Sequence, residues 1–248
     1  MSRIAIVAGT LGFWLSVAGV AGIILSPLGF RLGLWDVPFA LRELLKYATY
    51  AALAGLALCI VGLLFAKLGK PPVPVGRAVA GLIISGLFAG YVVVQYNKVQ
   101  SLPYIHDITT DTTNPPAFVA LADARKAAPN GLDYKGADIA AQQKKAYPDV
   151  TTMRSALPPT QLFAKAESVA REMGWEIVAA DAKEGRIEAT QTTLLYGFKD
   201  DVVIRIAADQ AGSKIDMRSM SRVGLSDVGV NAARIRKFSS ALRAIGGI

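Results

Sequence analysis

Reactive side chains are scarce in this sequence of 248 residues, which holds one cysteine, Cys59, and one histidine, His106. A single cysteine excludes an intrachain disulfide and leaves the redox compartment open. The Walker, Rossmann, CxxC and HExxH patterns are absent, as is the GxSxG turn of α/β-hydrolases. These absences remove the commonest nucleotide-binding, redox, zinc-protease and esterase hypotheses, and we expect no cofactor.

Acidic side chains are almost missing from the first hundred residues. Residues 1–98 carry eight basic and two acidic side chains, whereas residues 99–248 carry nineteen and seventeen. Most of the net charge of +8 therefore belongs to the apolar part, where basic residues flank hydrophobic segments. Because the rest of the chain is nearly neutral, we expect no nucleic-acid partner.

Long uncharged runs are present instead, over Ile4–Leu25, Tyr47–Ala66 and Ala78–Val94. A helix needs about 20 apolar residues to cross a bilayer. Ser26-Pro27 is expected to end the first helix. A cleaved signal peptide is the alternative for the first run, but the run is longer than the roughly 7–15 apolar residues of such signals. The sequence therefore predicts an anchor of three transmembrane helices over residues 1–98, with the lipid bilayer as a partner.

Two features of this anchor leave alternatives open. Pro27–Lys46 mixes apolar with charged side chains, as in a segment that lies along the membrane surface. A loop folded against the spans is an equal alternative. In the third run, the Gly86-xxx-Gly90 spacing would let another helix approach closely, although small residues are common in any spanning helix.

The membrane orientation follows from basic residues near the span ends. Lys67, Lys70 and Arg77 crowd the short connection between the second and third runs. Short, positively charged connections favour the cytoplasm. We therefore expect a bacterial inner-membrane protein whose C-terminal domain lies in the periplasm.

Residues 99–248 are predicted to form a soluble α+β domain, with residues 101–116 as the joint to the anchor. The joint holds three prolines, which disfavour helix. Helices are expected at 117–128, 136–146 and 158–174, with a last helix from Ser226 or Asp227 to about Ala244. Strands are expected at 175–180, 186–192, 202–207 and 214–222, after an extended stretch at 150–157. The result is an antiparallel sheet of four to five strands flanked by helices.

The first candidate site is an anion-binding set made of Arg205, Arg218, Arg222 and Ser226. Arg218 and Arg222 share one face of a strand that leads to a helix start. Guanidinium groups and free helix N–H groups suit a phosphate or carboxylate. The alternative is pairing of these arginines across the sheet with the acidic residues Glu188, Asp200, Asp201 and Asp216.

The second candidate set is His106, Asp107 and Asp111 in the joint. One imidazole and two carboxylates are possible ligands of a divalent metal. The alternative is that they order the joint through hydrogen bonds to nearby backbone. No residue is assigned a catalytic role.

Several sequence blocks of the domain carry a resemblance to a known family. The blocks are Ile105–Asp111, Asn114–Pro116, Ala146–Asp149, Gly185–Thr190, Gly197–Arg205, Ser219, Ser221–Arg222, Gly224, Ser226–Asp227, Gly229, Asn231 and Arg234. Through them the domain resembles, over residues 101–245, the domain of unknown function 1499 family, including members with membrane spans ahead of the domain. At Leu195-Tyr196 the chain lacks an aromatic pair that the family has. Because the family has no assigned activity, the resemblance implies no catalytic residue.

These features favour binding over catalysis. We expect a membrane-anchored envelope accessory module whose domain recognises a partner protein or an anionic, lipid-like ligand near the bilayer. One alternative is a hydrolase or metal-dependent enzyme that uses His106, Asp107 and Asp111. Another is a structural subunit of a larger membrane complex.

Overall fold

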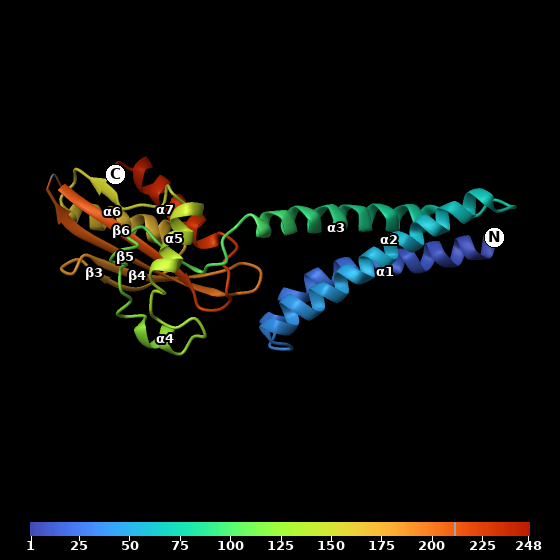
Figure 1. The fold of residues 1–248 in the computed structure, drawn as a ribbon, viewed down its shortest axis with the longest axis horizontal. Coiled ribbons are helices and arrows are strands. Elements are labelled where there is room, and N and C mark those ends of the chain that lie inside the picture. The colour runs from blue at the N-terminus through green and yellow to red at the C-terminus, as the bar shows by residue number, and fades with distance from the viewer. Residues whose placement is uncertain (211) are drawn as a thin grey trace. The chain divides into compact units, whose positions relative to one another are not determined.

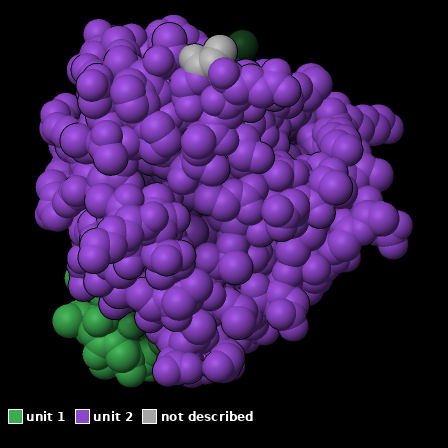
Figure 2. Space-filling view, turned by 90° about the vertical axis from the view of Figure 1, so that its left-hand side faces the viewer, with its two compact units in different colours: residues 1–99 green, residues 100–248 purple. Residues whose placement is uncertain are grey.

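The structure, a computed structural model, describes residues 1–210 and 212–248. It divides into two compact units, Met1–Val99 and Gln100–Ile248 (Figure 2). Unit 1 consists of helices, and unit 2 combines one antiparallel sheet with helices. The predicted α+β class is therefore confirmed.

Unit 1 contains three helices that are long and apolar enough to cross a membrane, Ser2–Arg31, Phe39–Leu68 and Gly76–Gln100. The first and third are α1 and α3, and the second joins a short π-helix, η1 (Phe39–Leu44), to α2 (Leu45–Leu68). At a rise of about 1.5 Å per residue, each exceeds the roughly 30 Å of a bilayer core. The predicted three-helix anchor is present.

The first helix does not end where the sequence predicted. α1 continues through Pro27 to Arg31, although a proline removes one backbone hydrogen bond from a helix. Polar groups beside this turn hydrogen-bond to the chain that follows α1. The Ser26 hydroxyl donates to the carbonyl of Ala40 at 2.8 Å, and the indole N–H of Trp35 donates to the Ser26 carbonyl at 2.9 Å. These bonds fold the connection after α1 back against that helix, which agrees with the folded-loop alternative.

Glycines let α1 and α2 approach closely. A Cβ added at Gly12 would lie 2.7 Å from the backbone nitrogen of Cys59, and one added at Gly55 would lie 2.7 Å from that of Ser16. By contrast, a Cβ at Gly86 or Gly90 would meet nothing within 4 Å. The Gly86-xxx-Gly90 spacing therefore takes no part in the packing within unit 1.

Unit 2 is built on a six-stranded sheet in which all neighbouring strands are antiparallel. The strand order is β1-β6-β5-β4-β3, and β2 also pairs with β6. The strands are β1 (Asp107–Thr109), β2 (Met153–Ser155), β3 (Glu176–Asp181), β4 (Arg186–Thr192), β5 (Lys199–Asp209) and β6 (Gly212–Ser221). The helices are α4 (Ala122–Lys126), α5 (Ala137–Ala146), α6 (Pro159–Glu172) and α7 (Val230–Ala244).

The predicted joint lies largely inside unit 2. Residues 105–110 are buried, and β1 pairs with β6 from Asp107 opposite Met220 to Thr109 opposite Arg218. The helix expected at 117–128 is reduced to α4, and the extended stretch at 150–157 contributes only β2. The longer predicted elements are present with shifted ends.

The two faces of the sheet differ in chemistry. One face is apolar and packs Ile204, Ile215 and Met217 against α6 and α7, where the rings of Trp175 and Phe238 stack at 5.6 Å. The other face carries most of the charged side chains of the strands, and α4 lies over it (Figure 1). In β6 the side chains alternate between these faces, with Ile215 and Met217 in the main apolar core and Met220 in a second, smaller apolar cluster.

We expect Gly12→Ala to destabilise unit 1 and Gly86→Ala to leave it nearly unchanged. The methyl group at position 12 would force the α1 and α2 backbones apart, and such overpacking costs about 1–3 kcal/mol. Purified protein in detergent micelles would be titrated with sodium dodecyl sulfate and followed by circular dichroism. Equal midpoints for the two variants would contradict the close approach.

Candidate functional site

The charged face of the sheet is covered by the chain between β1 and α5. This covering segment, residues 110–134, lies over the outward side chains of β4, β5 and β6 and contains α4. A small apolar cluster of Phe118, Leu121, Val203 and Met220 fixes it to the sheet. The remaining contacts across this interface are polar. The sheet contributes Glu188 and Thr190 from β4, Asp201 and Arg205 from β5, Asp216 and Arg218 from β6, and Arg222 just beyond β6.

Glu188 is fully buried and is held by backbone N–H groups of the covering segment. Its carboxylate accepts the N–H groups of Val119, Ala120 and Leu121 at 2.9–3.0 Å, and the Arg186 guanidinium lies 3.2 Å away. Successive backbone N–H groups of this kind form a common cradle for anions. Here the anion is a side chain of the same domain.

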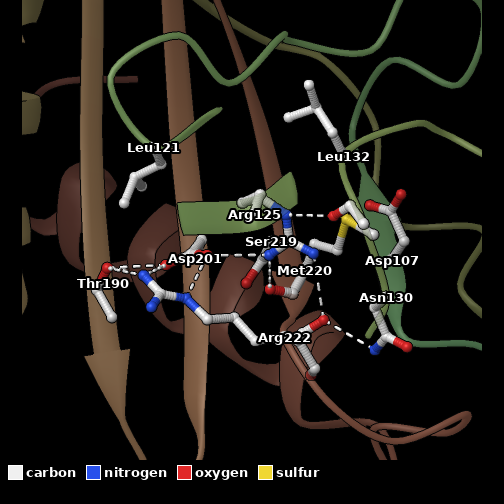
Figure 3. A network of polar contacts seen from close by, with 12 residues as sticks. Asp107, Leu121, Arg125, Asn130, Leu132, Thr190, Asp201, Ser219, Met220 and Arg222 are labelled. Carbon is white, nitrogen blue, oxygen red and sulfur yellow. Dashed lines mark hydrogen bonds and ion pairs between the residues drawn. The ribbon is translucent and has the colours of Figure 1, made fainter. Parts of the chain in front are cut away.

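Arg125 of α4 enters the charged face and is completely buried. Its guanidinium donates to the Asp201 carboxylate and to the Met220 carbonyl, each at 3.0 Å (Figure 3). It also donates to the carbonyl of Gly131 at 2.9 Å. Burial lowers the pKa of the Arg125 guanidinium, and the neighbouring Asp201 opposes this shift. The short helix α4 is thus fixed to the sheet by one buried cation.

Asp201 is shared between two arginines. Arg222 donates to both of its carboxylate oxygens at 2.8 and 2.9 Å, and Thr190 donates to one of them at 2.8 Å (Figure 3). The hydrogen bond to Asp201 raises the pKa of Arg222. The carboxylate therefore accepts from Arg125, Arg222 and Thr190 and has little capacity left for a further ligand.

Arg218 forms a bidentate ion pair with Asp107 of β1, with N–O distances of 2.8 and 2.9 Å. Both side chains are at most 5% exposed. The guanidinium also lies over the rings of Phe118 and Tyr134 at 5.1 and 5.7 Å. Burial raises the pKa of Tyr134 to about 12. A charge enclosed this completely is not available to a soluble anion.

Arg205 bridges two carboxylates at the other end of the charged face. It donates to Asp216 at 2.9 Å and to Asp111 at 3.1 Å. Asp111 also accepts the N–H groups of Thr113 and Asn114. Burial raises the pKa of Asp111, but these N–H groups and Arg205 lower it overall. Asp111 thus orders its own turn and ties the covering segment to the sheet.

The start of α7 already carries a carboxylate. Asp227 accepts the N–H groups of Gly229 and Asn231 at 2.8 and 2.9 Å, and burial raises the pKa of Asp227. Ser226 accepts the N–H of Val228 at 3.3 Å. α7 begins at Val230, a few residues later than predicted, and Asp227 holds its first turn from outside the helix.

The predicted anion-binding residues do not share an open pocket. Arg205 and Arg222 pair across the sheet with Asp216 and Asp201, as the sequence alternative stated, while Arg218 takes Asp107. Each guanidinium is satisfied by a carboxylate of the domain, so an external anion would have to displace one. Anion binding at this cluster stays a prediction that the contacts disfavour.

Within the described residues, His106 makes no ion pair with either of the two carboxylates predicted with it, although Asp107 lines the same small cavity. Its Nδ1 lies 3.3 Å from the Leu225 carbonyl, and its buried Nε2 has no hydrogen-bond partner among the described residues. The ring lines a cavity of about 120 Å³, smaller than the 300–1,000 Å³ typical of ligand sites. Burial lowers the pKa of the imidazole, which favours the neutral form.

A metal site is not assembled in the described part of the chain. Asp107 is engaged by Arg218 and Asp111 by Arg205. Across residues 1–210 and 212–248, no group of three or more histidine, cysteine, aspartate or glutamate side chains is placed to hold a metal. The alternative function of these residues, ordering the start of the domain, agrees with their contacts.

A groove of about 590 Å³ lies between α7 and the chain leading into β2. Three arginines line it. Arg236 pairs with Asp149 at 2.6 Å, Arg154 pairs with Asp209 at 2.9 Å, and Arg243 makes no ion pair within the described residues. The lining consists of Asp149–Arg154 on one side and Ile235, Arg236, Ser239, Ser240, Arg243 and Ile248 on the other.

Sequence reasoning missed this groove, although one signal was present. Arg236, Ser239, Ser240 and Arg243 recur every three to four residues, which is the spacing of one helix face. The other wall comes from a segment more than 80 residues earlier in the chain. A single sequence gives no indication that the two walls face each other.

The comparisons with known proteins concern the same domain. A family described as protein of unknown function (DUF1499) matches residues 107–242. This chain belongs to the DUF1499 family. The match begins at the first residue of β1 and includes all six strands of the sheet, so the DUF1499 domain contains the covering segment as well as the sheet. No curated protein and no solved structure matches the chain.

We expect Arg218→Met to destabilise the DUF1499 domain by about 3–5 kcal/mol, because it leaves the Asp107 carboxylate buried without its partner. The double variant Asp107→Leu with Arg218→Met should recover most of that loss, since it removes both charges. Hydrogen exchange of β5 and β6 peptides in the full-length protein would measure both. The single variant Asp107→Leu would be measured as well. If the loss of stability in the double variant equals the sum of the losses in the two single variants, the ion pair does not couple the two positions.

The domain is also expected to lose stability on acidification through His106. An unfolded histidine takes up a proton near pH 6.5, whereas burial lowers the pKa of His106 in the folded domain. The unfolded state then binds more protons as the pH falls from about 6.5 to the folded pKa, so stability falls over that window. In melting curves of the full-length protein at several pH values, His106→Gln should flatten this dependence. An unchanged slope would show that another group causes it.

Proposed function

We propose that this protein is a membrane-anchored binding module of the bacterial inner membrane. Its DUF1499 domain lies in the periplasm and binds the phosphate or carboxylate group of an anionic, lipid-like ligand. The single observation that carries this proposal is the arginine- and hydroxyl-lined groove between α7 and the chain leading into β2. It replaces the buried arginine cluster as the binding site.

The membrane part of the proposal rests on the three long apolar helices. Lys67, Lys70 and Arg77 flank the connection between α2 and α3, and that stretch has no acidic residue. This supports a cytoplasmic location for the connection. Since α3 crosses once more, the domain after it is assigned to the opposite side.

The groove has the chemistry expected of an anion site. Its lining holds three arginines and one acidic side chain, Asp149. Arg236 is paired with Asp149 and Arg154 with Asp209, so the charge of Arg243 is the one left uncompensated within the described residues. Arg236 is already oriented by Asp149, while Arg243 remains available for a ligand. Hydroxyl groups of Ser239 and Ser240 lie beside these cations and can donate hydrogen bonds. Its volume of about 590 Å³ also falls within the range of ligand pockets.

Binding fits the groove better than turnover does. The lining contains neither histidine nor cysteine, and its one acidic side chain, Asp149, is occupied by Arg236. A general base needs a free lone pair within reach of the proton it removes. The arrangement can hold and orient an anion without activating a nucleophile.

We expect sn-glycerol 3-phosphate, used as a headgroup probe, to stabilise the full-length protein in detergent against thermal unfolding beyond the effect of chloride at the same ionic strength. Arg243→Gln should weaken this binding about tenfold, since one charge-assisted hydrogen bond is worth about 1.5 kcal/mol. Lys237→Gln is the matched control, because Lys237 lies on α7 and does not line the groove.

The outcomes separate the possibilities. Loss of stabilisation in Arg243→Gln but not in Lys237→Gln supports the groove. An equal loss of stabilisation in both variants would show that the probe responds to the net charge of the domain and not to the groove. Absence of any stabilisation in the unchanged protein would remove the ligand proposal and favour a module that binds a protein partner.

A further inference from the structure

Three connections of the DUF1499 domain lie at one end of its sheet. β4 ends and β5 begins at the paired residues Thr192 and Lys199. β6 ends at Ser221, opposite Asp200, and β1 begins next to it at Asp107. The stretches 101–106, 193–198 and 223–229 therefore lie at the same end, as Figure 1 shows for unit 2. We call these three stretches, with Val230, the apolar end.

Direct contacts confirm that two of these stretches touch. The N–H of Asp227 donates to the Ile105 carbonyl at 3.0 Å. Tyr104 and Leu225 line the same small cavity. The third stretch is adjacent through the backbone, because the N–H of Arg222 donates to the carbonyl of Lys199 at 3.0 Å. The apolar end is thus one continuous region of the domain.

The apolar end has almost no charge, although the domain as a whole is rich in it. The turn at 193–198 has the sequence TLLYGF and carries no ionisable side chain other than a tyrosine. In the other two stretches the ionisable groups are Tyr104, His106 and Asp227. His106 and Asp227 are buried, and the low pKa of His106 favours its neutral form.

Large apolar side chains are exposed at this end. Leu194 and Leu195 are 85% and 66% exposed, Tyr104 is 66% exposed and Leu225 is 54% exposed. Val228 and Val230 are also exposed, and Val228 has a φ of +52°, which β-branched residues rarely adopt. Single exposed apolar residues are ordinary, but several gathered on one charge-free end indicate an interaction surface.

The chain itself indicates what this surface faces. α3, a candidate membrane span, ends at Gln100, and the first exposed large apolar side chain of the apolar end is that of Tyr104. Four residues extend at most roughly 14 Å. The chain therefore keeps the apolar end within a short reach of the C-terminal end of α3, a candidate span.

The residues beside the apolar end also suit a lipid surface. Lys199 and Lys135 are exposed next to it, and Lys135 lines the same cavity as Tyr104 and Leu225. Basic side chains around an apolar patch favour anionic headgroups. Tyrosines such as Tyr104 and Tyr196 are typical of the membrane interface.

We propose that the apolar end of the DUF1499 domain docks on the bilayer that holds its own anchor. Leu194, Leu195 and Leu225 enter the boundary between headgroups and acyl chains, while Lys135 and Lys199 contact headgroups. The domain is then held at the membrane by two attachments, the α3 tether and this end. This contact is independent of the anion groove, so either can fail without the other.

The test uses full-length protein in liposomes that contain anionic phospholipid. Leu195→Cys and Leu225→Cys would be labelled with an environment-sensitive dye, because Cys59 is buried and should not react. The matched control is Lys183→Cys, an exposed position in the turn between β3 and β4 at the opposite end of the sheet. Quenching is measured with nitroxide-bearing lipids and with aqueous iodide.

We expect the labels at 195 and 225 to show blue-shifted emission, quenching by lipid nitroxide and protection from iodide, and the label at 183 to show the reverse. Replacing Leu194 with Asp should reduce the lipid quenching of the label at 225. Equal iodide quenching at 195 and 183 would overturn the proposal. Protection from both quenchers would also overturn it, because it would identify a protein as the occupant.

Discussion

The structure of the DUF1499 domain depends on the need to neutralise buried charge on one face of its sheet. A buried carboxylate or guanidinium is costly unless it is paired and hydrogen-bonded. Asp201 meets this need by binding Arg125 and Arg222 together, and Asp107 meets it through Arg218. The segment over this face contains little helix, and one small apolar cluster joins its Phe118 and Leu121 to the sheet. Its remaining contacts are polar, so its position depends largely on where its polar groups find partners.

The same constraint explains why polar residues with the composition of a binding site stabilise the fold here. An arginine-rich strand beside aspartates has the composition of an anion or metal site. The contacts show the arginines used internally, which leaves the outer surfaces for binding. Such buried pairs add little net stability compared with apolar residues of the same volume, but a wrong strand register would leave them unpaired. A rigid interior with a single register is a suitable scaffold for a groove and an apolar end.

The parts of the fold that were predictable from sequence are those with a strong local pattern. The three apolar helices, α6, α7 and the strands from β3 to β6 follow hydrophobic runs or regular alternation. β1 and β2 have three residues each and no pattern of their own, because they form through pairing with β6. The burial of Arg125 leaves no local signal in the sequence, since its partner Asp201 lies 76 residues away. The groove was missed for the same reason, because its two walls come from distant segments.

The pairing of β1 with β6 also constrains the order in which the domain can mature. Asp107 is made near the start of the domain, and its partner Arg218 follows 111 residues later. During synthesis the amino-terminal part of the domain is made first. Asp107 and Arg125 must therefore stay hydrated until β6 has been made. Contacts between residues this far apart in sequence form slowly. Any product truncated before β6 would expose an unpaired strand edge and an uncovered charged face, which are the features that recruit chaperones and degrading proteases.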